Sequence, residues 1–226
     1  MAAYIIYFIA MMLLPIYAQM KVKSAYKKYS KVPADKGMTG AQVARMILDH
    51  HGLYDVRVVP TQGVLSDHYN PATKTVALSE DNFYNNSLAG TAVAAHEVGH
   101  AIQHAEAYSF LTLRAKLVPV ANIAANFSYL PLMIGLIAQQ SGLMLIGIVL
   151  LAASVLFQVV TLPVEFDASK RAMNEVVSLG IISNNEERDA KKVLSAAAMT
   201  YVAAAAVAVL ELLRFVLIFL NMNNDD

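Results

Sequence analysis

Four long runs of apolar residues dominate the pattern of this chain, and each approaches the roughly 20 residues of helix that cross a bilayer. They cover residues 4–20, 117–138, 143–163 and 196–220. The second run is the weakest, because polar or helix-breaking residues interrupt it: Asn122, Asn126, Ser128 and Pro131. The pattern predicts four transmembrane helices, with a buried or half-embedded hairpin over residues 117–163 as an alternative.

Basic residues lie almost entirely between these runs. Residues 21–116 begin with a lysine cluster and contain further basic residues, and residues 164–195 contain five more. The loop at residues 139–142 and both termini contain none. A secretory signal peptide carries its charge before the apolar run, so the first run is better interpreted as an uncleaved anchor. The positive-inside rule then places both long connecting segments in the cytoplasm and both termini outside.

This topology divides the chain into consecutive segments with different environments. We expect an N-terminal transmembrane anchor (1–20), a cytoplasmic segment (21–116), a transmembrane helical hairpin (117–163), cytoplasmic helices (164–195) and a C-terminal transmembrane helix with a polar tail (196–226).

The cytoplasmic segment shows both helical and strand-like patterns. Thr39 can cap an amphipathic helix, and residues 56–59 and 75–78 have the pattern of short strands. The expected fold class is α+β and mostly α, with a small sheet before the helix that carries His96. An open edge strand, supplied by residues 64–69 or 75–79, could bind an extended substrate. A sheet that only packs under the helix is the alternative.

Composition supports a membrane protein. The chain is 57% hydrophobic and 15% charged, whereas soluble domains are about 45–50% apolar and about 25% charged. A formal net charge of zero gives no indication of a nucleic-acid partner. The chain has no cysteine, which leaves histidine and carboxylate side chains as candidate metal ligands.

The strongest chemical signal is the sequence His-Glu-Val-Gly-His at residues 96–100. Histidines four apart on a helix project from one face, so His96 and His100 can reach one zinc ion. Glu97 is placed to accept a proton from the attacking water. The surrounding helix is apolar nearly all round, and burying such polar side chains without partners is costly. Zinc supplies the missing partner, with a structurally satisfied histidine pair as the alternative.

A catalytic zinc usually has three protein ligands and one open position. His104 lies about 12 Å along the helix axis from His96, which is too far for one ion. The metzincin pattern requires a histidine six residues after the second ligand, where this chain has Glu106.

Glu165 is the better candidate for the third ligand. Pro163 is expected to mark a helix boundary just before it. Two membrane crossings between His100 and Glu165 return the chain to the cytoplasmic side. The alternative is that Glu165 and Asp167 only favour the start of a helix, and Asp167 and Glu106 are the reserve ligands.

Other polar residues are weaker candidates. His68 and Tyr69 could stabilise developing negative charge on a carbonyl oxygen, although a polar turn is the simpler interpretation. Arg171 could contact substrate or support a ligand. Glu211 and Arg214 are three residues apart in the last apolar run, where pairing would lower the cost of burial.

Several segments together resemble a known family: residues 39–44, 65–71, 94–105 and 162–166. Over essentially its full length the chain resembles the bacterial membrane-bound neutral zinc metallopeptidases of the YugP type. More distantly it is similar to the integral membrane gluzincins of the HtpX and CAAX-protease type. The resemblance implies a gluzincin-like site in which Glu165 completes the zinc ligands. The wider group has an aspartate where this chain has Ser169, and Asp167 is a candidate substitute.

The function expected from these features is a zinc-dependent endopeptidase in the bacterial cytoplasmic membrane, with one catalytic Zn²⁺ facing the cytoplasm. Its substrates would be membrane proteins or peptides, and a homo-oligomer or a membrane partner protein stays open. One alternative is a zinc-binding scaffold without activity. Another is a transporter, which is disfavoured because Glu211 and Arg214 are the only charged residues within the four apolar runs.

Overall fold

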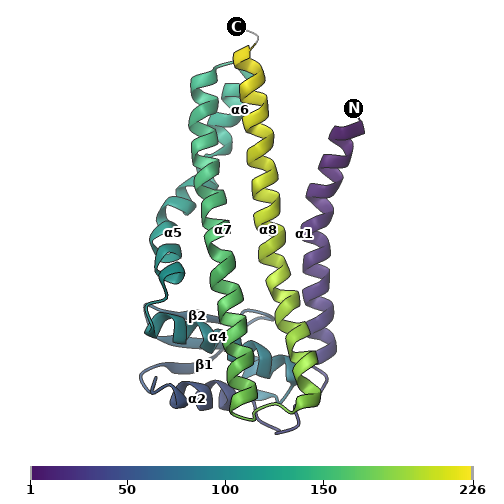
Figure 1. Ribbon diagram of the computed structural model, residues 1–226, viewed down its shortest axis with the longest axis vertical. Coiled ribbons are helices and arrows are strands. Elements are labelled where there is room, and N and C mark those ends of the chain that lie inside the picture. Colours follow the sequence, from purple (N-terminus) through teal and green to yellow (C-terminus); the bar gives the residue numbers. More distant parts are fainter. Residues whose placement is uncertain (1, 225–226) are drawn as a thin grey trace. The chain divides into compact units, whose positions relative to one another are not determined.

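The computed structural model describes residues 2–224, which form eight helices and one small sheet (Figure 1). The elements in chain order are α1 (Ala2–Tyr29), α2 (Gly40–His50), β1 (Arg57–Thr61), β2 (His68–Asn70), β3 (Thr75–Ser79), α3 (Glu80–Tyr84), α4 (Leu88–Ala105), α5 (Ser109–Phe127), α6 (Tyr129–Ile137), α7 (Ser141–Ser178) and α8 (Asn184–Asn224). The predicted α+β, mostly helical composition with a small sheet before the His96 helix is confirmed.

Four stretches of helix are long and apolar enough to cross a membrane, as predicted: Ile5–Tyr29, Ser109–Ile137, Ser141–Ser178 and Asn184–Asn223. The second is divided between α5 and α6 at Ser128. Pro131 lies in the first turn of α6. Proline is tolerated there, because backbone N–H groups in the first turn of a helix have no acceptor within that helix. The interruption noted in the sequence is therefore a real break between two helices.

The expected helix boundary at Pro163 is wrong. Pro163 lies inside α7, which continues without interruption to Ser178. A proline in an apolar helix is tolerated where neighbouring groups satisfy the freed backbone. Helix α7 therefore contains both the third apolar run and Glu165.

The chain divides into two compact units, one of which comprises residues 16–111 and 164–200. Its sheet has the order β1-β3-β2, with β1 parallel and β2 antiparallel to β3. Every residue of β3 is buried. The central strand is therefore β3, so residues 75–79 cannot be the open edge, and β1 and β2 are the edge strands.

Helix α4 is the centre of this unit. Ser87 caps it by accepting a hydrogen bond from the backbone N–H of Gly90 at 3.0 Å. Most of its residues are buried, and together with α2 it supplies half of the buried residues of the hydrophobic core. Helix α2 begins with the expected cap, since Thr39 and Gln42 form a reciprocal capping box. The buried residues of α4 are thus held in fixed positions by packing.

The other unit consists of residues up to 15, 112–163 and from 201 onward. Its core contains Leu132, Met144, Ile148, Leu151 and Phe215. Glu211 and Arg214 form the predicted ion pair, and the Tyr7 hydroxyl donates a hydrogen bond to Glu211 Oε2 at 2.6 Å. The two charges within the last apolar run are thus paired, which lowers the cost of placing them in lipid.

Candidate metal centre

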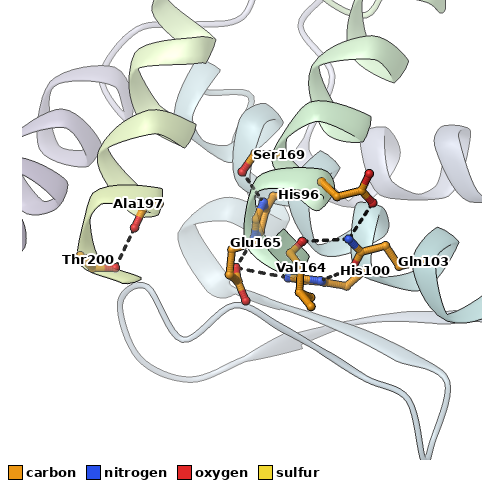
Figure 2. Close-up of polar contacts among 9 residues, drawn as sticks. His96, His100, Gln103, Val164, Glu165, Ser169, Ala197 and Thr200 are labelled. Atoms are coloured by element: carbon orange, nitrogen blue, oxygen red, sulfur yellow. Dashed lines mark hydrogen bonds and ion pairs between the residues drawn. The ribbon is translucent and has the colours of Figure 1, made fainter. Parts of the chain in front are cut away.

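Helices α4 and α7 bring together three side chains that can bind a metal (Figure 2). Glu165 Oε2 lies 3.3 Å from His96 Nε2 and 3.6 Å from His100 Nε2. All three donor atoms lie within 4.8 Å of one another. The two histidines lie on consecutive turns of α4, and Glu165 approaches them from α7. These are the residues that the sequence nominated as ligands.

The donor set fits zinc. Nitrogen and oxygen ligands about 2.1 Å from a tetrahedral zinc are separated from each other by roughly 3.4 Å. The distances from Glu165 Oε2 to the two histidine nitrogens, 3.3 and 3.6 Å, bracket that value. Two imidazoles and one carboxylate leave a fourth position for water or substrate, as in catalytic sites.

The His100 ring is held from behind by Gln103. The Gln103 side chain is fully buried, and its Oε1 lies 3.0 Å from His100 Nδ1 (Figure 2). Its Nε2 donates to the Val164 carbonyl at 2.8 Å and to Asp167 Oδ2 at 2.9 Å. These two contacts identify Nε2 as the donor end of the amide, so Oε1 can only accept the hydrogen bond that His100 Nδ1–H donates. The lone pair of His100 Nε2 is then directed at the metal position.

The His96 ring is held in the same way by Ser169. The Ser169 hydroxyl oxygen lies 3.2 Å from His96 Nδ1 (Figure 2). The short Ser169 side chain therefore reaches the ring without a carboxylate at this position. Asp167 has a different place, since it accepts from Gln103 and from Arg171 Nε.

The electrostatics favour a charged glutamate facing the histidines. Burial would raise the pKa of Glu165, but hydrogen bonds and charge from His100 and His96 outweigh it and lower the pKa well below the ordinary value. Burial would lower the pKa of His100, but its hydrogen bond to Glu165 and the charges of Glu97 and Glu165 raise it overall. A divalent cation would replace the proton that these groups share.

Glu97 is almost completely buried on α4, directly after His96. Its charge is close enough to contribute to the raised pKa of His100. A carboxylate beside the ligands is thus kept away from bulk water, in the position expected for a proton acceptor.

The remaining candidates lie outside the three-donor group. The Tyr69 hydroxyl lies 2.8 Å from His104 Nδ1, which links β2 to the end of α4. The exposed His68 ring lies 2.9 Å from the Ser66 carbonyl. Both His68 and Tyr69 belong to strand β2, so their interpretation as a polar turn is wrong. Of the two reserve ligands, Glu106 pairs with Arg171 Nη1 at 2.7 Å, and Asp167 pairs with the same guanidinium.

Gln103 is the functional candidate that sequence reasoning missed. An amide three residues after a metal-binding histidine has no motif of its own. The available signal was a polar residue in a helix that is otherwise apolar, which demands a buried partner.

Comparison with known proteins agrees with this site. The model of the family described as "Putative neutral zinc metallopeptidase" matches residues 4–220. The chain belongs to this family of zinc metallopeptidases. It is also 53% identical over 218 residues to the Bacillus subtilis (strain 168) protein named "Putative membrane protease YugP", covering 96% of this chain and 97% of that one. No solved structure matches. Membership of the zinc metallopeptidase family implies zinc, and the three donors described above fit that metal.

Proposed function

We propose that this zinc metallopeptidase is an endopeptidase embedded in the bacterial cytoplasmic membrane. Its zinc ligands would be His96, His100 and Glu165, in a gluzincin-like arrangement. The observation that carries the proposal is the convergence of these three donors beside the buried carboxylate of Glu97.

The proposed mechanism assigns proton transfer to Glu97. Zinc bound at this site would lower the pKa of a bound water toward about 7 and polarise the scissile carbonyl. Glu97 accepts the proton that water loses as its oxygen attacks the carbonyl carbon, then delivers it to the leaving amine as the C–N bond breaks. Glu97 therefore ends in its starting state. Gln103 and Ser169 keep the histidine rings oriented throughout.

The proposed substrates are membrane proteins, or peptides with an unfolded segment near the cytoplasmic face. Two features support them: the apolar helices that would hold the enzyme in lipid, and the edge strands β1 and β2 of the same unit as the site. Cleavage rates for one unfolded sequence, free and fused to a membrane anchor, test this. A faster reaction of the free form in liposomes would argue against a membrane substrate.

The decisive experiment compares wild type with Glu97→Gln, both purified with zinc, on an unfolded protein substrate. We expect cleavage by wild type to be abolished by a zinc chelator and to fall roughly a hundredfold or more in Glu97→Gln. Glu187→Gln is the matched control, since Glu187 is exposed in the first turn of α8. Equal cleavage by Glu97→Gln and wild type would refute the assigned base. Stoichiometric zinc without cleavage by wild type would favour a scaffold role.

A further inference from the structure

A groove of about 710 Å³ lies between α1 and α8, within the unit formed by residues 16–111 and 164–200. Its walls repeat at helical spacing: Lys21, Ser24 and Lys28 on α1 face Arg188, Lys192 and Ser195 on α8. The two helices lie side by side there and run in opposite directions (Figure 1). Small side chains, Ser24, Ala25, Ser195 and Ala196, also line it, which leaves room for a ligand between the helices.

The groove is strongly basic. Five cations line it: Lys21, Lys28, Arg188, Lys191 and Lys192. None of the described residues that line it is acidic. Asp189, at its margin, pairs with Lys192 at 2.7 Å and accepts a hydrogen bond from the Tyr29 hydroxyl at 3.1 Å. Discounting that pair, four positive charges face one space, an arrangement that favours an anion.

The groove is also amphipathic along its length. On α1, the apolar run ends at Met20 and the basic residues begin at Lys21; on α8, the basic residues end at Lys192 and the apolar run begins at Ala196. Tyr17, Met20 and Met199 line the apolar end, and Met20 is 65% exposed. Both helices thus change from charged to apolar at the same level, which is how a site at a membrane surface is built.

We propose that this groove binds an anionic phospholipid. Its phosphate lies among Lys21, Lys28, Arg188 and Lys191, and its acyl chains extend along Tyr17, Met20 and Met199. A free phosphate would use the basic end but not the apolar end, and a neutral lipid the reverse. Basic pockets between helices on the cytoplasmic side are the expected recognition sites for such head groups. A lipid bound there contacts α1 and α8 together and stabilises their packing.

The test measures binding of phosphatidylglycerol and phosphatidylcholine to the full chain in detergent, by native mass spectrometry and thermal shift. We expect phosphatidylglycerol to bind wild type and raise its melting temperature, and phosphatidylcholine to do neither. The variant Lys21→Gln/Lys28→Gln should lose about 30-fold in phosphatidylglycerol affinity. Arg188→Gln/Lys191→Gln, on the other helix, should lose as much, which separates loss of the site from misfolding of α1.

The matched control is Lys23→Gln/Lys27→Gln, which removes two exposed charges from the same helix outside the groove. It should keep wild-type affinity. An equal loss in the control and groove variants would overturn the proposal, because only general attraction to basic residues would remain. Inorganic phosphate that binds as tightly as phosphatidylglycerol would overturn it too, since the site would then be one for a free anion.

Discussion

Gly99 of α4 lies so close to Ala168 of α7 that a β-carbon on Gly99 would stand 2.6 Å from the Ala168 carbonyl oxygen. Ala168 is itself fully buried. The contact lies one residue before His100 and three residues after Glu165, so it sets the spacing between the two helices that supply the donors. The glycine in His-Glu-Val-Gly-His is thus explained by packing.

Replacing Gly99 with alanine should therefore separate the donors. The added methyl group cannot fit without moving backbone, and overpacking of this kind costs about 1–3 kcal/mol. We expect Gly99→Ala to lower the melting temperature and to weaken zinc binding at least tenfold, measured by chelator competition. Gly142→Ala is the control, because a β-carbon there meets open space. Wild-type zinc affinity in Gly99→Ala would mean that the two helices can separate without disturbing the donors.

Gln103→Leu should damage the site without touching a ligand. Loss of the amide removes the acceptor that holds His100 Nδ1 and leaves the Val164 carbonyl without this donor. Partners of this kind contribute about 10- to 100-fold in metal affinity or activity. We expect a fall of that size in zinc affinity, followed by competition with a fluorescent chelator, while helix content by circular dichroism stays constant.

Ser169 offers a complementary test on the other histidine. Ser169→Ala removes the contact to His96 Nδ1 and should weaken zinc binding. Ser169→Asp restores the side chain of the wider group and should bind zinc at least as tightly as wild type, since a carboxylate is a stronger acceptor. If Ser169→Ala and wild type bind zinc equally, the hydroxyl does not orient the ring.

The pKa directions at the site predict opposite pH dependences with and without metal. Without zinc, the raised pKa of His100 stabilises the folded state. This contribution is fully present below about pH 6.5 and is lost as the pH rises through the raised pKa. The lowered pKa of Glu165 also stabilises the folded state. This contribution is fully present above about pH 4.3 and is lost as the pH falls through the lowered pKa. The metal-free pair therefore stabilises most between about pH 4.3 and 6.5.

Zinc bound at the proposed site should reverse this trend, because it would bind His100 only after the proton has left. Stabilisation by zinc should grow as pH rises through the raised pKa of His100. Melting temperatures of chelator-treated and zinc-loaded protein between about pH 5 and 8 check both statements. His100→Gln should remove the stabilisation by zinc at every pH, because it deletes one of the three proposed ligands. A zinc effect that is constant over this range would show that no proton is displaced from the pair.

How far the sequence predicts this site depends on the range of each interaction. His96 and His100 follow from helix geometry, because four residues always return to the same face. The prediction of Glu165 as a ligand required an argument about membrane crossings, because its closeness to the histidines depends on tertiary structure. Gln103 was missed since its partners, Val164 and Asp167, are more than sixty residues away. The helix boundary predicted at Pro163 was wrong, because α7 continues through the proline despite its low helix propensity.

The fold shows the same limit. Strand-like patterns located β1 and β3 closely, but strand order decides which is an edge, and order is a property of pairing between distant segments. Four long apolar helices could be predicted because composition alone determines them. The break between α5 and α6 at Ser128 was indicated only by the polar residues and proline around it.

The predicted orientation of the chain in the membrane can be measured directly with single introduced cysteines, because the chain has no cysteine of its own. Tyr54 is 75% exposed in the segment predicted to be cytoplasmic, and Gln140 is exposed in the loop predicted to lie outside. In intact spheroplasts, a membrane-impermeant maleimide should label Gln140→Cys and spare Tyr54→Cys. Both should react after permeabilisation, which controls for accessibility. Labelling of Tyr54→Cys alone would invert the topology and move the zinc site outside, whereas protection of both would favour the half-embedded hairpin over residues 117–163. The positive-inside rule makes the first pattern the expected one, because the basic residues cluster in the segments that contain the zinc donors.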